Sequence, residues 1–169
     1  METAIAKKPA ENTAKDRLLQ LVGFKIGKET FGVNILMVQE IIRKVNITNI
    51  PDCPEFIEGV INLRGNIIPV IDLRKRLRLY DPDKYDEGNW IIILNIQGRV
   101  TGFIVDSVTK VLKVPLTSFS HPPDLVVSGL KSHYIHGVCK VEKDLLIILN
   151  FDRILLIDEI KKLKEMRRH

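Results

Sequence analysis

The sequence predicts an all-β protein made of two small packed barrels, with a few short helical segments. Two observations support this prediction. Runs rich in Ile, Val and Leu alternate with Gly, Pro, Asn and Asp from Leu18 to about Phe151, which is the pattern of short strands separated by turns. One pattern of apolar residues and glycines also occurs twice along the chain, which indicates an internal repeat.

The first segment, residues 1–16, lacks apolar periodicity and is rich in Ala, Lys, Glu and Thr. Such a segment cannot bury enough surface to offset the entropy of ordering, so we expect a disordered tail. It also lacks the continuous apolar stretch of a secretory signal. Because no apolar run approaches the ~20 residues that cross a bilayer, we expect a cytoplasmic protein without membrane insertion.

Strands follow from Leu18 onward. The segments LLQLVGFKI and FGVNI flank GKET, which predicts a hairpin. Ile35, Val38 and Ile41 then recur at a spacing of three, which predicts a helical turn over Ile35–Glu40. The runs NIIPVIDL and DLLIILNF are apolar on both faces, as in strands buried between two layers.

The end of the chain has a different pattern. The spacing of apolar residues over Arg153–Arg168 predicts a helix, so that residues 156–169 would form a basic C-terminal helix or tail. We expect neither this helix nor the helical turn over Ile35–Glu40 to change the fold class.

The repeat becomes clear when the chain is aligned with itself. FGVNILMVQEI matches TGFIVDSVTKV at an offset of 70, which aligns Gly32 with Gly102. FIEGV matches YIHGV, and IIPVIDL matches LLIILNF, at an offset of 78. Each unit of roughly 60–70 residues has the size of a small Greek-key or SH3-like barrel. We expect two barrel subdomains at approximately 17–85 and 86–155, with intertwined boundaries, and a cleft between them where a partner could bind.

Charge and cysteine content argue against several functional classes. The net charge is +5, but much of the excess lies near the C-terminus and aromatic residues make up only 6% of the chain. Nucleic-acid binding through basic and stacking side chains is therefore not expected. Cys53 and Cys139 are far apart and lack zinc-site spacing, so we expect two reduced thiols.

Motifs of catalysis are missing from the sequence as well. It contains no phosphate-binding glycine loop and no GxSxG or HExxH motif. His133 and His136 would lie on opposite faces of a strand and could not share a metal. The acidic loop that begins at Asp81 lacks the glycine that a calcium loop needs at its sixth position. We therefore expect no catalytic residue, metal or cofactor, and we interpret the protein as a binding protein rather than an enzyme.

One long segment carries a specific resemblance. FIEGVINLRGNIIPVIDLR, Phe56–Arg74, resembles the signature of the CheW family of chemotaxis coupling proteins, and FGVNILMVQEI, RVTGFIVDSV and YIHGV extend the resemblance over roughly residues 18–155. The resemblance implies two intertwined five-stranded SH3-like barrels in a CheW-like domain over residues 17–155. It also implies a monomeric, non-catalytic adaptor that joins the cytoplasmic hairpin tip of chemoreceptors to the regulatory domain of a CheA-type histidine kinase, at membrane-associated receptor arrays.

The resemblance also nominates receptor-binding residues. These are Val38, Gly59, Arg64, Gly102 and Gly137, with Glu40, Asn62, Leu63 and Gly65 beside them. Each has a structural alternative: the glycines could permit close backbone approach, Val38 could belong to the core, and Arg64 could pair internally with Glu40. No residue is nominated for binding the kinase.

Overall fold

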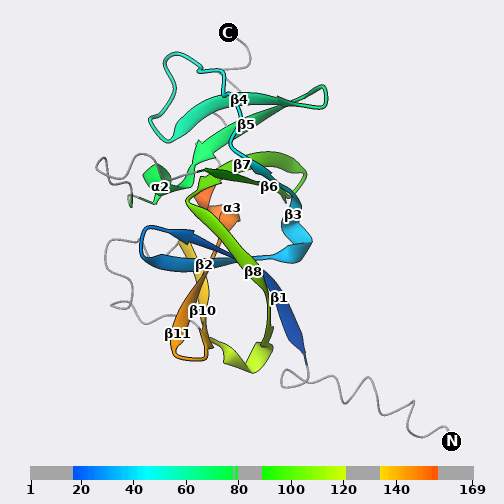
Figure 1. The fold of residues 1–169 in the computed structure, drawn as a ribbon, viewed down its shortest axis with the longest axis vertical. Helices are drawn as coiled ribbons and strands as arrows, with labels where there is room; N and C mark the ends of the chain where they lie inside the picture. Colours follow the sequence, from blue (N-terminus) through cyan, green and yellow to red (C-terminus); the bar gives the residue numbers. More distant parts are fainter. Residues whose placement is uncertain (1–16, 78, 80–88, 121–133, 156–169) are drawn as a thin grey trace, which may run out of the picture.

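The computed structural model describes residues 17–77, 79, 89–120 and 134–155 (Figure 1). The expected N-terminal tail over residues 1–16 and the basic segment 156–169 lie outside these ranges, as do the acidic loop 81–88 and His133. Within the described residues, no helix is long and apolar enough to cross a membrane.

The chain forms two sheets that curl into two stacked barrels, which confirms the all-β fold class (Figure 1). A five-stranded sheet lies at one end of the molecule and a six-stranded sheet at the other. The five-stranded sheet has the order β3 (Val38–Arg43), β6 (Trp90–Ile96), β7 (Arg99–Val105), β5 (Asn66–Asp72) and β4 (Ile57–Leu63). The six-stranded sheet has the order β8 (Ser107–Pro115), β1 (Leu18–Ile26), β2 (Glu29–Asn34), β11 (Asp144–Leu149), β10 (Ile135–Val141) and the two-residue strand β9 (Phe119–Ser120).

The repeat found in the sequence relates the elements of the structure. Strands β1, β2 and β3 correspond to β6, β7 and β8, and β4 and β5 correspond to β10 and β11. The sheets mix the two copies, because β1 and β2 join the sheet of β8, β10 and β11, whereas β6 and β7 join the sheet of β3, β4 and β5. Each sheet thus contains strands from both 17–85 and 86–155. The parallel pairings are also equivalent: Gly32 pairs with Ile148, and Gly102 pairs with Val70.

The expected helical turn over Ile35–Glu40 is wrong beyond Met37. A 3₁₀ turn, η1 (Ile35–Met37), is capped by Asn34, whose Oδ1 accepts a hydrogen bond from the Leu36 N–H at 2.9 Å. Strand β3 begins at once with Val38 and pairs with β6. The β-branched side chains of this segment favour that pairing, so tertiary context decides against a spacing that also fits a helix.

Three short helical elements complete the described chain. They are α2 (Leu73–Arg76), α3 (Phe151–Ile154) and the 3₁₀ turn η3 (Leu116–Ser118). Helices α2 and α3 are repeat equivalents that follow β5 and β11. Of the helix expected over Arg153–Arg168, only the beginning lies in the described residues, where α3 ends at Ile154.

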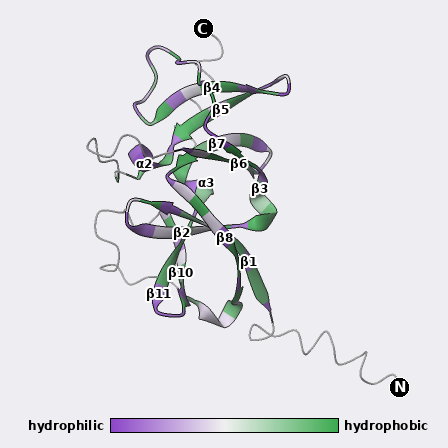
Figure 2. Ribbon diagram, viewed as in Figure 1, coloured by the Kyte–Doolittle hydropathy of each residue, from purple (hydrophilic) through white to green (hydrophobic). Residues whose placement is uncertain are grey.

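The main hydrophobic core lies between the barrels and is shared by them. It contains Phe24 and Phe31 from the six-stranded sheet and Ile92 and Phe103 from the five-stranded sheet. Each barrel adds a smaller cluster of its own, around Val70 in one and around Leu146 in the other. Apolar residues accordingly run along the strands of both sheets (Figure 2). Because the largest cluster belongs to both barrels, burial of apolar surface stabilises their association as well as each sheet.

Candidate functional site

The tip of the β4–β5 hairpin collects four of the nominated residues. Leu63 pairs with Asn66 across the turn, and the two residues between them, Arg64 and Gly65, have φ values of 51° and 88°. Positive φ at both central positions is the signature of a type I′ turn, which matches the twist of the flanking strands. The Asn62 Oδ1 accepts a hydrogen bond from the Gly65 N–H at 2.8 Å, which closes the turn. The arrangement places Arg64 at the tip of the hairpin.

Arg64 binds Glu40 through two hydrogen bonds. Its Nη1 donates to Glu40 Oε2 at 3.0 Å, and its Nη2 donates to Glu40 Oε1. The pairing lowers the pKa of Glu40, mainly through these hydrogen bonds, and raises that of Arg64 for the same reason. The structure therefore contains the internal pair of Arg64 with Glu40 that is the structural alternative to a receptor contact. The Arg64 side chain nevertheless remains 69% exposed and that of Glu40 31% exposed, so a partner could still reach both.

The pair stands beside a groove of about 580 Å³ at the end of the five-stranded barrel. Leu63 and Ile67 contribute apolar surface, and Arg99 and Val100 of the neighbouring strand β7 also line the groove. Ile67 is 61% exposed and adds apolar area to the groove. The groove thus combines a bidentate ion pair with exposed apolar surface.

Gly59 and Gly137 are repeat equivalents with a structural role. Both follow a register shift in their strands, β4 and β10, and both are buried. A Cβ at Gly59, whose φ is 144°, would overlap the carbonyl oxygen of Thr48, and one at Gly137 would overlap the Phe119 ring. Thr48 makes two backbone hydrogen bonds of 2.9 Å with Val60 and so closes the barrel beside β4. These glycines allow a close approach that side chains would prevent.

The other nominated residues lie in the walls of the barrels. Gly102 is buried in β7, where a Cβ would lie 2.9 Å from Cγ2 of Ile91. Val38 is half-buried in β3 and packs against the shared core. The structure therefore brings Glu40 together with the turn Asn62–Gly65, and places Gly137 in the other barrel.

Sequence reasoning missed a second surface, at the point where η1 crosses from one sheet to the other. Leu36 is 88% exposed there. Beside η1, Met37, Phe119, His136 and other side chains line a cavity of about 240 Å³. The repeat alignment contained a signal, because Leu36 stands at the position of Asp106 in the second copy. Because one copy has an apolar residue where the other has a charged one, the two crossings are expected to have different surroundings.

The described residues include one histidine, His136, and two free cysteines. His136 packs against the Phe119 ring, with 5.3 Å between ring centroids. Burial raises the pKa of both thiols, Cys53 and Cys139, which keeps them protonated and weakly nucleophilic. Within the described ranges, no three His, Cys, Asp or Glu side chains gather in a way that could hold a metal ion.

Comparisons with known proteins agree on one family. The CheW-like domain family matches residues 20–159. The chain is 35% identical over 156 residues to the chemotaxis protein CheW of Treponema pallidum (strain Nichols), covering 89% of this chain and 90% of that protein. It is 34% identical to the chemotaxis protein CheW of Klebsiella aerogenes, with 92% and 90% covered. The crystal structure of the scaffolding protein TtCheW from Thermoanaerobacter tengcongensis superposes with a TM-score of 0.76 at 36% identity, covering 85% of this chain and 96% of that one.

Proposed function

The chain belongs to the CheW family, and from that premise we propose that it is a non-catalytic chemotaxis adaptor that binds chemoreceptors and a CheA-type histidine kinase at the same time. Such a protein acts by holding two partners at a high effective concentration and in one geometry. It needs no cofactor and no covalent step. In this role it works in the cytoplasm, as a monomer when alone, and is recruited to membrane-associated receptor arrays.

The observation that carries the proposal is the exposed pair of Arg64 and Glu40 at the edge of the apolar groove. A guanidinium held by a carboxylate keeps donors on its outer side, and Ile67 provides apolar area next to it. A helical hairpin tip presents both kinds of chemistry, because apolar and charged side chains lie close together on its surface. The receptor tip therefore binds here in our proposal, with Arg64, Glu40 and Leu63 as direct contacts.

The buried nominated residues act differently in this proposal. Gly59, Gly102 and Gly137 are enclosed by neighbouring atoms, so they cannot provide much contact area. Their role is to preserve the shape of the barrel walls that carry the groove. Val38 contributes in the same way, through the core beneath β3.

The kinase binds the other barrel in our proposal. Leu145, the repeat equivalent of Ile67, is 53% exposed at the corresponding place on β11. Each barrel therefore presents an exposed apolar side chain beside its hairpin tip. The internal symmetry provides two similar faces on one body, which is what a protein needs in order to bridge two partners.

The proposal is tested by co-purification of a receptor cytoplasmic fragment and a CheA-type kinase with the wild-type chain, with Arg64→Ala and with Lys113→Ala. Lys113 is an exposed cation on β8 of the other barrel and serves as a control for charge. We expect wild type and Lys113→Ala to retain both partners, and Arg64→Ala, with an unchanged unfolding midpoint, to lose the receptor. If the folded wild-type chain binds neither partner, the proposed function is wrong; if Arg64→Ala keeps the receptor, the site is wrong.

A further inference from the structure

The chain passes between the two sheets at two repeat-equivalent places that differ in chemistry. One is η1, where Leu36 is exposed. The other is Asp106, which lies between β7 and β8 and is largely buried. Figure 1 shows both crossings at the junction between the barrels. The first crossing leaves an apolar side chain in solvent, whereas the second places a carboxylate inside the junction.

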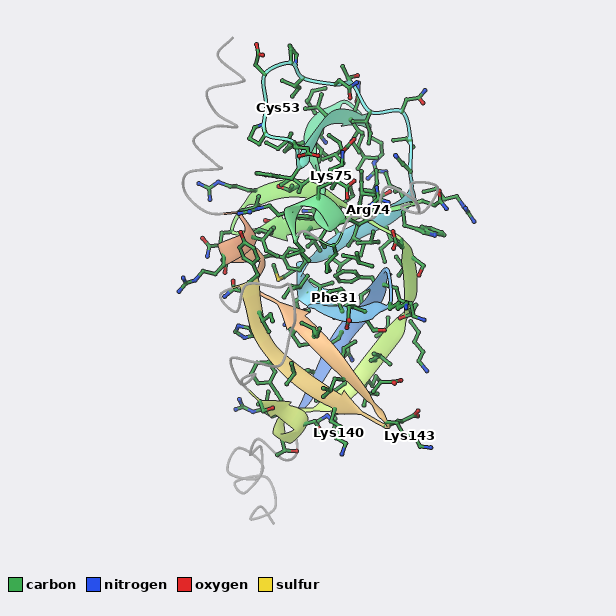
Figure 3. All side chains as sticks on the ribbon, turned by 90° about the vertical axis from the view of Figure 1, so that its left-hand side faces the viewer. Phe31, Cys53, Arg74, Lys75, Lys140 and Lys143 are labelled. Carbon is green, nitrogen blue, oxygen red and sulfur yellow. The ribbon has the colours of Figure 1, made fainter. Side chains whose placement is uncertain are left out.

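Asp106 belongs to a buried group of three charges. Arg74, on α2, donates from Nε to Asp72 Oδ1 at 2.9 Å and from Nη2 to Asp72 Oδ2 at 2.8 Å. Its Nη1 faces Asp106 Oδ1 at 3.7 Å. The other carboxylate oxygen of Asp106, Oδ2, accepts a hydrogen bond of 2.6 Å from the Gly27 N–H in the β1–β2 turn. These contacts connect α2 of the five-stranded barrel to a hairpin of the six-stranded barrel, and Figure 3 shows Arg74 at this level of the molecule.

Arg76, two residues after Arg74 on α2, makes a second connection between the barrels. Its Nε donates to the carbonyl oxygen of Ile154, on α3, at 3.1 Å. Its guanidinium carbon lies 4.8 Å from the centroid of the Phe56 ring and 4.9 Å from that of the Tyr134 ring. Phe56 precedes β4 and Tyr134 precedes β10, and the two are repeat equivalents. The guanidinium therefore lies between matching aromatic rings, one from each barrel.

Neither connection is repeated on the other side of the junction. The repeat equivalents of Arg74, Arg76 and Asp106 are Asp152, Ile154 and Leu36, and this set contains no cation. The Asp106 contacts thus have no copy at the other crossing, and the Arg76 contacts join equivalent positions of the two copies, next to an apolar core that both barrels share. Apolar burial has no preferred direction, whereas charge-assisted hydrogen bonds fix the orientation of the groups they join.

We propose that Arg74, Arg76 and Asp106 are positioning residues that hold the two barrels at one fixed angle. The shared core keeps the barrels together, and the polar contacts select one orientation among those that the core would allow. The orientation of the barrels is a property of the isolated protein, so the proposal does not depend on the proposed partners.

The test measures the distance between the barrels directly. Spin labels are placed at Ile67→Cys and Leu145→Cys, exposed positions on β5 and β11, in a full-length chain that carries Cys53→Ser and Cys139→Ala. Double electron–electron resonance then gives the distribution of label distances. The parent should give one narrow distribution, while Asp106→Asn and Arg76→Met should shift or broaden it.

The variants are chosen to keep the fold. Asp106→Asn retains an oxygen for the Gly27 N–H, and Arg76→Met retains an apolar side chain between the two rings. Glu58→Gln is the control, because it removes the carboxylate charge from the 2.8 Å pair with Lys75 inside the five-stranded barrel. We expect the control to match the parent. If Arg76→Met fails to fold, Arg76→Lys replaces it, since it keeps the charge but loses the planar donor. Distributions in the folded junction variants that are as narrow as the control's, and centred at the same distance, would overturn the proposal.

Discussion

The carboxylate of Glu40, on β3, receives both Nη groups of Arg64 from the tip of the β4–β5 hairpin. Strands β3 and β4 are the two edges of the five-stranded sheet, so the pair joins edges that the order of strands keeps apart. The backbone bonds between Thr48 and Val60 join the same region. The pair therefore has a structural role and is also accessible, and experiments must separate the two.

A double-mutant cycle separates them. Because both side chains are substantially exposed, screening by water limits the contribution of the pair to stability. We expect Arg64→Ala, Glu40→Ala and the double variant to unfold in denaturant close to the wild-type midpoint, with a coupling energy that is small but not zero. Receptor binding should be lost with Arg64→Ala all the same. Strong coupling in the isolated protein, together with normal receptor binding, would mean that the pair only supports the barrel.

The pH dependence of stability should report the lowered pKa of Glu40. A carboxylate whose folded pKa is depressed adds stability that is complete above its unfolded value, here 4.5, and is lost as the pH falls through the folded pKa. Glu40→Gln removes this contribution, so the difference in unfolding free energy between wild type and variant should shrink below pH 4.5. Urea titrations between neutral and acidic pH measure this difference. A difference that stays constant over the range would show that Arg64 does not stabilise the charged form.

Gly59→Ala should be strongly destabilising. A side chain there adopts a φ of 144° and also meets the Thr48 carbonyl, which combines backbone strain with overpacking, each costing about 1–3 kcal/mol. Gly65→Ala is the matched control, since its φ is 88° and a Cβ would have no atom within 4 Å. We expect its cost to be limited to backbone strain, about 1–2 kcal/mol. Denaturant unfolding measures both, and equal losses would contradict the close-approach explanation.

Some of this architecture could be predicted from the sequence because strand periodicity and the repeat are visible along the chain. Which strands are exchanged between the sheets could not be predicted, because both copies have the same apolar pattern and the pattern does not distinguish β5 from β11 as the partner of β2. The predicted helical turn is wrong from Val38 onward, because a spacing of three fits several conformations in so short a segment. The pairing of Arg64 with Glu40 could be anticipated as one alternative for Arg64, whereas the exposure of Leu36 depends on the crossing between the sheets.

Thiol reactivity should rank the two cysteines by their surroundings. Burial raises the pKa of each above 9.0, so the reactive thiolate is scarce at neutral pH. Cys53 is partly exposed, whereas Cys139 is fully buried. In native protein we expect a thiol reagent to modify Cys53 slowly, with a rate that increases as the pH rises toward 9.0, and Cys139 only on unfolding. Mass spectrometry of digested samples identifies the site, and early labelling of Cys139 would contradict the packing described for β10.

Truncation of the shared core should weaken both barrels together. The Phe103 ring, from β7, contacts Phe151 edge-on with 5.0 Å between centroids, and Phe103→Ala should cost about 3–5 kcal/mol through lost burial and a cavity. The single tryptophan, Trp90, reports on the five-stranded barrel, and hydrogen exchange of β10 and β11 reports on the other. Because the largest cluster belongs to both sheets, both probes should report the same decrease in the free energy of unfolding. Leu146→Ala truncates a side chain in the smaller cluster of the six-stranded barrel and is the comparison for a change confined to one barrel. If Phe103→Ala destabilised only the region around Trp90, the barrels would be independent folding units and the shared core would not unite them.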